Sequence, residues 1–382
     1  MSAAAGPLAG LRVVALEQAV AAPLCSRHLA DLGAEVVKVE RPGGGDFSRD
    51  YDTFVGGMAS HFVWLNYRKR SVVLDLKSRD GRASLLRLLE TADVFLSNLS
   101  PGAVERIVPD RELEQLNPRL VTCQISGYGP SGPYRDRKAF DLLVQGEAGV
   151  TVNTGLPGEP AKPGVSLADL GAGIYAATAI LAALRARDLT GRGDRVHISM
   201  FDVLTEWMSP LLLAYREGGA TIEPAGTRHA SITPYGPFLV ADGTVVNIAV
   251  QNDRQWLVLC GVLELDDLAR DDRLATNAGR LQHRVRVETA VAAAVSTWPP
   301  AELEVALDRE GVPWGRFNET ADVARHPQLE ADGRWTEVCL PSGESVSVVA
   351  HPFRFASGQM PDDTPRVPAL GEHTDEVLRA HR

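Results

Sequence analysis

One aspartate stands where a long run of small and apolar residues begins, and its carboxylate is the group best placed to do chemistry. Residues 165–187 read VSLADLGAGIYAATAILAALRAR, and Asp169 comes just before helical spacing starts at Gly171. We therefore expect Asp169 to precede a helix and to accept a hydrogen bond from an amide of its first turn. An ordinary helix cap has the same local pattern, so a purely structural role stays open.

The two glycines that follow this aspartate favour a functional role. Gly171 and Gly173 fall in the expected first turn, where each glycine costs a helix about 1 kcal/mol relative to alanine. A missing side chain lets a ligand approach the backbone amides and the carboxylate. The apolar face expected for this helix carries Ile174, Ala177, Leu181 and Leu184.

A glycine-rich loop and a second carboxylate come earlier in the chain. Residues 126–134 read SGYGPSGPY and follow an expected strand. Such loops often serve only as turns, but this position makes the loop a candidate wall of an active site. Asp141 then offers a carboxylate that could pair with Asp169 for acid–base work, and a capping or surface role fits its type equally well.

Positive residues gather in the first half of a chain whose formal net charge is -10. Several stand where strands are expected to end, which is the edge at which open α/β sheets bind ligands. Residues 98–102 follow a strand and lead into a helix, so their amides could face a phosphate. A ligand with several phosphates would suit this set, although each cation singly fits a solvated surface charge. The cations are Arg41, Arg68, Lys69, Arg70, Lys77, Arg106, Arg135, Arg137 and Lys138.

Short apolar runs that alternate with helical segments predict the fold class. Residues 11–16 and 35–39 suit buried strands on either side of a helix at 23–32, which is typical of a parallel, Rossmann-like α/β sheet. No GxGxxG joins the first strand to its helix and no GxxxxGK[ST] occurs, so NAD or ATP binding of the usual kind is not expected. Further strands are expected at 71–76, 94–96, 120–125 and 195–199, and helices at 81–91 and 112–116.

A stretch rich in Gly, Thr and Pro divides the chain. We expect a large Rossmann-like domain over residues 1–216, completed by 325–382, with a linker at 217–230 and a smaller α+β domain at 231–324. Chain order alone leaves two sequential domains equally open. Other expected elements are strands at 244–250 and 342–350, helices at 254–263, 284–296 and 301–310, and a final helix capped by Thr374.

The composition is that of a globular protein of 382 residues, 45% hydrophobic and 23% charged. The acidic balance argues against nucleic acid or an anionic membrane as a partner. The first ten residues lack the basic start and apolar core of a signal peptide. Neither a CxxC nor an HxxxH pair occurs, so we expect no metal centre, and the scattered cysteines favour the cytoplasm. These cysteines are Cys25, Cys123, Cys260 and Cys339.

Taken together, these motifs resemble the family III CoA-transferases, the family of formyl-CoA transferase and carnitine CoA-transferase. The resemblance runs over nearly the whole chain, and the order of the motifs makes it specific. It is carried by LGAEVVKVERPGGGD, KRSVVLDLKSRDG, SNLSPGAVERI, SGYGPSGPY, the Asp169 segment, TGRGDRV and LGEHTDEVL.

The resemblance implies roles for individual residues. Asp169 matches the family's catalytic aspartate, and coenzyme A enters as a substrate with no tightly bound cofactor. The implied architecture is a ring-shaped chain of two domains that interlocks with a second copy in a homodimer. The positions matching CoA contacts are Val20, Ala21, Arg41, Leu74, Lys77, Asn98, Leu99, Ser100, Arg106, Lys138 and Asp141.

The implied chemistry is covalent catalysis on the aspartate. Asp169 would attack the acyl-CoA carbonyl to give a mixed anhydride, and the released thiolate would convert the anhydride into an aspartyl-CoA thioester. An incoming acid would reverse these steps. Backbone amides near Gly171 or in the glycine-rich loop could hold the developing oxyanion.

The substrates follow from finer features of the resemblance. Val20 stands where formyl-CoA transferase has a glutamine, and the glycine-rich lid of that enzyme is missing after Glu217, which argues against formyl or oxalyl substrates. Residues 228–238 and 250–256 look like members that use succinyl-CoA with C4–C5 dicarboxylates such as mesaconate, itaconate, citramalate or malate. Arg228 or His229 would then hold the distal carboxylate, although an exposed linker charge is equally compatible.

Two other functions remain open. The α-methylacyl-CoA racemases resemble this chain at the aspartate, but they use a histidine as a second base where this chain has Phe140. A non-catalytic acyl-CoA-binding protein of the same fold is the alternative from another class. Retention of Asp169 with both glycines argues against that alternative.

Overall fold

The computed structural model describes residues 6–361 and 363–381, which group into two units. The first comprises Met1–Val150, Pro163–Pro210 and Leu329–Arg382, and the second Thr151–Lys162 and Leu211–Gln328. The second unit is thus inserted into the first. Residues 151–162, 211–216 and 325–328 were expected in the large domain but belong to the second unit.

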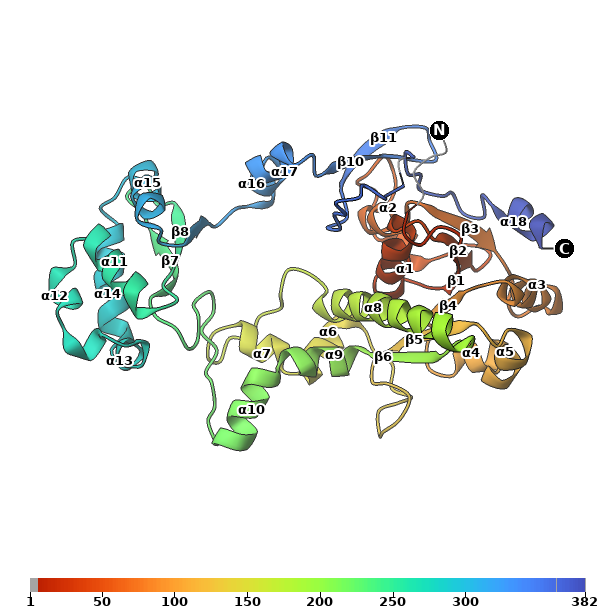
Figure 1. Cartoon of the computed structure of the whole chain (residues 1–382), viewed down its shortest axis with the longest axis horizontal. Helices are drawn as coiled ribbons and strands as arrows, with labels where there is room; N and C mark the ends of the chain where they lie inside the picture. Colours follow the sequence, from red (N-terminus) through yellow and green to blue (C-terminus); the bar gives the residue numbers. More distant parts are fainter. Residues whose placement is uncertain (1–5, 362, 382) are drawn as a thin grey trace. The chain divides into compact units, whose positions relative to one another are not determined.

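A six-stranded parallel sheet forms the centre of the first unit (Figure 1). Its strand order, β3-β2-β1-β4-β5-β6, is that of a Rossmann fold, with the order reversing between β1 and β4. All five strand pairs are parallel; Val14 of β1, for example, lies beside Val37 of β2 and Phe95 of β4. The strands are β1 (Arg12–Leu16), β2 (Glu35–Glu40), β3 (Lys69–Val73), β4 (Val94–Ser97), β5 (Val121–Ser126) and β6 (Arg195–Ser199).

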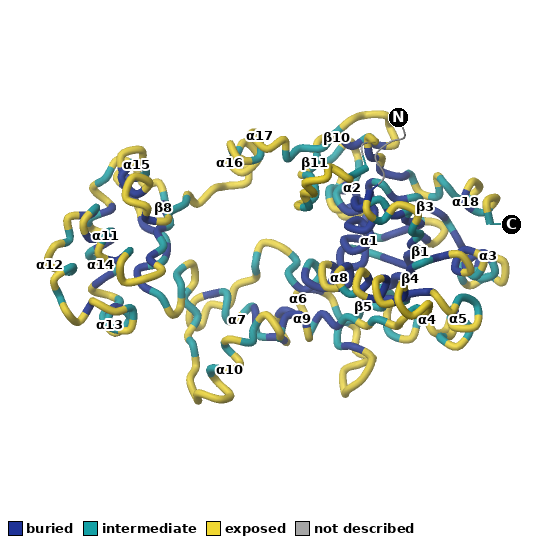
Figure 2. Tube along the Cα trace, in the orientation of Figure 1, coloured by how far each residue is buried: buried dark blue, intermediate teal, exposed yellow. Residues whose placement is uncertain are grey.

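Alternating side chains of each strand fill two separate cores. In β1, Val13 and Ala15 pack on the face covered by α1 (Ala21–Asp31) and α8 (Leu167–Thr190). Val14 and Leu16 point to the opposite face, covered by α3 (Arg79–Glu90) and α5 (Asp110–Leu116). Figure 2 shows the buried positions concentrated along the strands and α1. Because both faces are covered, the strands read as continuous apolar runs.

Helix α8 differs from expectation in the face that it buries. Ile174 and Leu181 are 49% and 36% exposed, whereas Ala177 and Leu184 are buried. The buried side is built mainly from alanine and glycine, because small residues let α8 approach α1 closely. Half of α8 is buried inside the protein, and it is the only helix among the described residues long and apolar enough to cross a membrane. A buried core helix passes the same test.

The two glycines of α8 serve this close packing. A Cβ on Gly173 would lie 2.7 Å from the carbonyl oxygen of Ala21, and one on Gly171 would lie 2.7 Å from side-chain atoms of Val203 and Trp207. Both glycines lie beyond the first turn of α8, which begins at Leu167. The predicted purpose of these glycines, to let a ligand reach the first turn, is therefore wrong.

Shorter elements complete the first unit. Helix α18 begins at Thr374, but its cap residue is His373, so the predicted Thr374 cap is wrong. Helix α2 packs against the antiparallel pair β10-β11. The remaining elements are 3₁₀ helix η1 (Phe47–Asp50), α2 (Ser60–Asn66), α4 (Ala103–Ile107), α6 (Asp141–Glu147), α9 (Met200–Trp207), β10 (Trp335–Cys339), β11 (Ser345–Val349) and α18 (Thr374–Ala380).

The second unit packs helices against a three-stranded antiparallel sheet of order β7-β8-β9. Its core joins the strands to α11, α14 and α15, with Trp256 as a fully buried side chain. Its strands are β7 (Tyr235–Leu239), β8 (Val245–Ala249) and β9 (Trp314–Arg316), and its helices α11 (Asp253–Val262), α12 (Asp266–Ala269), η2 (Asp272–Leu274), α13 (Asn277–Gln282), α14 (Arg284–Val295), α15 (Pro300–Glu310) and α16 (Thr320–Ala324). Helices α7 (Val150–Thr154), α10 (Ser209–Gly218) and α17 (Pro327–Ala331) span the unit boundaries.

Candidate active site

A cavity of about 600 Å³ opens beyond the carboxyl ends of β1, β4 and β5, where the strand order reverses. We call it the Asp169 cavity. Only the start of the glycine-rich loop, Ser126 and Gly127, lines it, together with the neighbouring Arg137. The predicted site residues that the fold brings together here are Val20, Ala21, Asn98, Leu99, Ser100, Lys138, Asp141 and Asp169.

Asp169 is the third residue of α8, inside the first turn and not before it. The predicted capping role therefore belongs to another residue. Burial, followed by the nearby negative charge of Asp141, raises the pKa of Asp169 to about 7. The carboxylate is thus poised between its neutral and ionised forms near neutral pH.

Asp141 caps α8 from a different helix. Its Oδ1 accepts hydrogen bonds from the amides of Ala168 and Asp169, at 2.9 and 3.4 Å. Its Oδ2 accepts a 2.6 Å hydrogen bond from Nε2 of Gln145, which is fully buried. Oδ1 therefore holds the start of α8, while Oδ2 is bound within α6, and capping is the structural alternative left open for this residue.

The sequence interpretation missed several residues of this site. Gln145 follows Asp141 by four positions on α6, and that helical spacing was the available signal. Tyr51 and His61 also line the cavity, with ring centroids 5.7 Å apart. Burial, with Asp46 and Asp169 nearby, raises the pKa of Tyr51, which places this phenol in the electrostatic field of Asp169.

A second cavity of about 790 Å³ adjoins the first and holds three of the predicted phosphate-binding cations. We call it the cationic groove. It lies beyond the carboxyl ends of β1, β2 and β3, and Gln18 and Leu99 border both cavities. Strand β3 ends at Val73, whereas residues 71–76 were expected to form this strand. The loop that follows β3 forms one side of the groove. The groove is lined by the predicted Arg41, Leu74, Lys77, Leu99 and Arg106 and by two cations not predicted there, Arg79 and Arg82.

The basic run 68–70 lies outside the groove. Lys69 is fully buried beneath the sheet edge, Arg70 pairs with Glu35 and Glu376, and Arg68 pairs with Asp363. Charged side chains that face away from a ligand must find internal partners or water. The hypothesis that this run contacts a phosphate ligand is therefore not supported.

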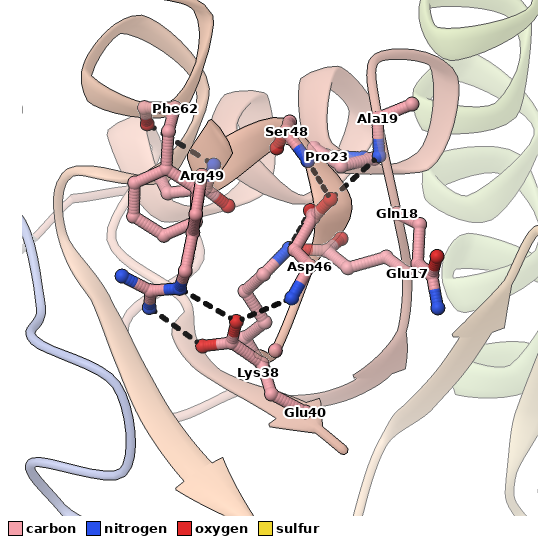
Figure 3. A network of polar contacts seen from close by, with 12 residues as sticks. Glu17, Gln18, Ala19, Pro23, Lys38, Glu40, Asp46, Ser48, Arg49 and Phe62 are labelled. Carbon is pink, nitrogen blue, oxygen red and sulfur yellow. Dashed lines mark hydrogen bonds and ion pairs between the residues drawn. The ribbon is translucent and has the colours of Figure 1, made fainter. Parts of the chain in front are cut away.

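A buried cluster of charges lies beneath the wall shared by the two cavities (Figure 3). Lys38 Nζ contacts Asp46 Oδ2 at 2.8 Å and Glu17 Oε1 at 3.3 Å, and Lys69 Nζ contacts the same Glu17 oxygen at 2.7 Å. All four side chains are shielded from solvent. Burial lowers the pKa of Lys69 to about 8, while Glu17 keeps a lowered pKa because the two lysines outweigh its burial.

This cluster holds the cavity wall in an unusual conformation. Ala19 has a φ of 60°, in the left-handed region that costs a non-glycine residue roughly 1 kcal/mol. Its amide donates a 3.1 Å hydrogen bond to Asp46 Oδ1. Asp46 therefore joins the buried lysines to the backbone that lines both cavities.

The predicted substrate residues Arg228 and His229 lie in the second unit. The Arg228 guanidinium is 3.5 Å from a Glu288 oxygen and stacks over Phe238, while His229 stacks on Tyr235. Both side chains are thus held by neighbours in their own unit. Among the described residues, no group of three or more His, Cys, Asp or Glu side chains could hold a metal ion.

Comparison with known proteins assigns this arrangement to a family. The pattern of CoA-transferase family III matches residues 8–374. The chain is 35% identical to succinate–glutarate CoA-transferase of Agrobacterium fabrum, over 97% of this chain and 95% of that protein. It is also 35% identical to succinyl-CoA:mesaconate CoA-transferase of Haloarcula hispanica, over 98% and 96%.

A solved structure agrees with the fold. The crystal structure of a CAIB/BAIF family protein from Brucella suis superimposes with a TM-score of 0.85 at 34% identity, covering 99% of this chain and all of that one. The family pattern matches nearly the whole chain, and the fold has the Rossmann-like sheet. These two findings identify the class of enzyme. The chain therefore belongs to CoA-transferase family III.

Proposed function

We propose that this enzyme moves CoA from succinyl-CoA to a C4–C5 dicarboxylate, with Asp169 as the nucleophile. The observation that carries the proposal is a single half-buried carboxylate in a cavity that adjoins a groove lined by five cations. The groove suits the phosphates of coenzyme A, and the adjoining cavity suits its acyl end. The end of the pantetheine arm of CoA would contact Val20, Ala21, Asn98 and Ser100. Lys138 would contact a charged group near that end.

The position of Asp169 in the cavity suits a sequence of acyl transfers. The complete sequence neither consumes nor releases a proton. A carboxylate oxygen of Asp169 attacks the thioester carbonyl, forming an anhydride and expelling the CoA thiolate. The thiolate attacks the aspartyl carbonyl, which gives an aspartyl-CoA thioester and free succinate. The acceptor carboxylate attacks that thioester to form a second anhydride, and the thiolate then takes the acceptor acyl group and restores Asp169.

The proposed substrates rest on the relatives. Glutarate and mesaconate appear in the names of two relatives that each match this chain at 35% identity. A dicarboxylate needs a cation for its distal carboxylate, and Arg228 or His229 remains our proposal for that role. Mesaconate, itaconate, citramalate and malate are the acceptors that we would test first.

We also propose that the enzyme works as a homodimer in the cytoplasm. The exposed side of α8 carries Ile174, Tyr175, Leu181 and Leu189, an apolar surface that a second copy would cover. All four cysteines are free, which suits a reducing compartment.

A screen of acceptor acids tests the proposed function directly. Purified enzyme would be incubated with succinyl-CoA and a panel of mono- and dicarboxylates, and the CoA esters would be followed by mass spectrometry. We expect new CoA esters of C4–C5 dicarboxylates and none of acetate or butyrate. CoA binding without transfer to any acid would favour the non-catalytic alternative, and deuterium uptake at the α-carbon of a 2-methylacyl-CoA would favour racemisation.

The raised pKa of Asp169 predicts an acid limit on turnover. Because only the ionised carboxylate attacks, kcat/KM for the donor, which reports the pKa of the free enzyme, should rise as pH increases through about 7. Asp141→Asn removes the neighbouring negative charge and should lower the pKa of Asp169, so that the acid limb moves to lower pH. The pH dependence of kcat/KM for the two proteins measures this shift. Asp188→Asn, at an exposed position of the same helix, is the control, and an unmoved acid limb in Asp141→Asn would contradict the assignment.

If the cationic groove binds the phosphates of the donor, loss of one of its cations should weaken donor binding without slowing the chemical steps. Arg106→Gln removes one of its cations and should raise KM for succinyl-CoA about tenfold with little change in kcat, since charged hydrogen bonds contribute roughly 1.5–3 kcal/mol. The loss should shrink at high salt. Arg111→Gln, exposed on α5 outside the groove, is the matched control. Equal KM values for the two variants would exclude the groove as the phosphate site.

A further inference from the structure

Gln18 occupies the junction between the Asp169 cavity and the cationic groove. Gln18 and Leu99 are the residues that border both. A molecule with its phosphates in the groove and its reacting carbonyl beside Asp169 would therefore pass close to these two residues. In an acyl-CoA, the part that spans this distance is the pantetheine arm.

The backbone of Gln18 is fixed on both sides. Its amide donates to Asn98 Oδ1 at 2.9 Å, and its carbonyl accepts from Asn98 Nδ2 at 2.8 Å. Glu17 before it belongs to the buried charge cluster, and Ala19 after it is bound to Asp46. Six hydrogen bonds or ion pairs within three residues, one of them from Ser26 to Glu17, leave the Gln18 side chain as the adjustable part of a rigid wall.

The side-chain amide of Gln18 has no hydrogen-bond partner among the residues that the structure describes. It is half-buried and points away from the charge cluster (Figure 3). Asn98, the neighbouring amide, has both its oxygen and its nitrogen occupied by the Gln18 backbone. Gln18 thus offers a free donor and a free acceptor at the junction, and Leu99 provides an apolar surface beside it.

We propose that Gln18 binds an amide of the pantetheine arm and so sets how far the thioester reaches toward Asp169. Each pantetheine amide carries one N–H and one carbonyl, which a glutamine side chain can pair reciprocally. The methylene groups between the two amides suit contact with Leu99. This inference rests on the proposed function, because it takes acyl-CoA as the ligand, but it concerns a residue that is neither the nucleophile nor one of the phosphate-binding cations.

Donors altered at a single amide test the proposal. Gln18→Met keeps the length of the side chain and removes its amide, so kcat/KM for succinyl-CoA should fall about tenfold. Two analogues of succinyl-CoA, each with one pantetheine amide replaced by an ester, identify the partner. With one of them, which lacks the N–H that Gln18 accepts, the wild-type enzyme should already lose part of its activity, and Gln18→Met should lose less than it does with the natural donor. With the other analogue, Gln18→Met should lose as much activity as with the natural donor.

Further measurements separate this role from a structural one. The KM for the acceptor acid should not change, and Gln18→Asn, which shortens the side chain, should bind CoA as weakly as Gln18→Met. Gln115→Leu, at an exposed position outside both cavities, controls for loss of any glutamine. A tenfold loss that is the same for all three donors, or no loss at all, would overturn the proposal.

Calorimetric titration with free CoA keeps this test independent of the proposed function. If the enzyme transferred CoA to none of the acids tested, weaker CoA binding by Gln18→Met would still support the contact. Unchanged binding of CoA, together with unchanged melting temperature, would refute it whatever the reaction proves to be.

Discussion

Replacing Asp169 by asparagine should abolish CoA transfer, with kcat reduced about a thousandfold or more. The asparagine keeps the size of the side chain but is a far weaker nucleophile, so neither the anhydride nor the aspartyl-CoA thioester can form. The measurement is turnover of succinyl-CoA with the best acceptor of the acid panel. Mass spectrometry of the wild-type enzyme quenched during turnover should show CoA added to the peptide that contains Asp169, and the variant should show none.

Binding measurements distinguish lost chemistry from lost structure. Asp169→Asn should still bind CoA, because the cationic groove is untouched. Asp188→Asn removes an exposed carboxylate from the same helix and should retain full activity. Substantial turnover by Asp169→Asn, or a CoA adduct on another peptide, would exclude Asp169 as the nucleophile.

Replacing Lys38 by methionine should cause the largest loss of stability, about 3–5 kcal/mol in the free energy of unfolding. Lys38 is fully buried and contacts Glu17 and Asp46, so its removal leaves buried carboxylates without a full set of partners. Urea unfolding at constant pH measures the change. Because Asp46 also holds the Ala19 amide, CoA affinity should fall in the same variant.

Two further variants show whether the charge balance is responsible. Lys38→Met combined with Asp46→Asn removes one charge of each sign and should cost less than the sum of the single changes. Arg270→Met, which breaks the exposed pair with Asp266, should leave the unfolding midpoint nearly unchanged. A Lys38→Met protein as stable as the wild type would show that the cluster contributes nothing to folding.

The strands of the parallel sheet could be predicted from the sequence because they depend on local pattern, and a local pattern also nominates Asp169 as the candidate reactive group. Residues 11–16 read as a buried strand because each face of the sheet receives an apolar side chain, and β1 is found at Arg12–Leu16. The helix that contains Asp169 was recognised from its spacing. The motifs that pointed to the family lie mostly at the ends of strands, and the family pattern confirms that resemblance. The short strands β7 and β9 of the second unit carried too little pattern to be found.

What each residue does within the site depended on its neighbours in space. Gly171 and Gly173 looked like access points for a ligand, but they meet Trp207 and Ala21, which the local sequence does not reveal. Asp169 looked like a cap, and the cap is Asp141, 28 residues earlier. Both errors arise because a helix terminus and a helix surface have the same local sequence whether their partner is water, another helix or a ligand.

The charged residues show most clearly the difference between what the local sequence indicates and what only the tertiary structure decides. Lys69 stands between two arginines in a run typical of a solvated surface, yet it is fully buried against Glu17, 52 residues away. Parallel pairing of β1, β2 and β3 brings these side chains together, and no local pattern encodes which strands become neighbours. The sequence by itself determined the six strands of the parallel sheet and the family, and it nominated Asp169 as the candidate nucleophile. Tertiary structure alone decided which charges are buried as partners and which remain free to meet a substrate, because that depends on the solvent exposure left after packing.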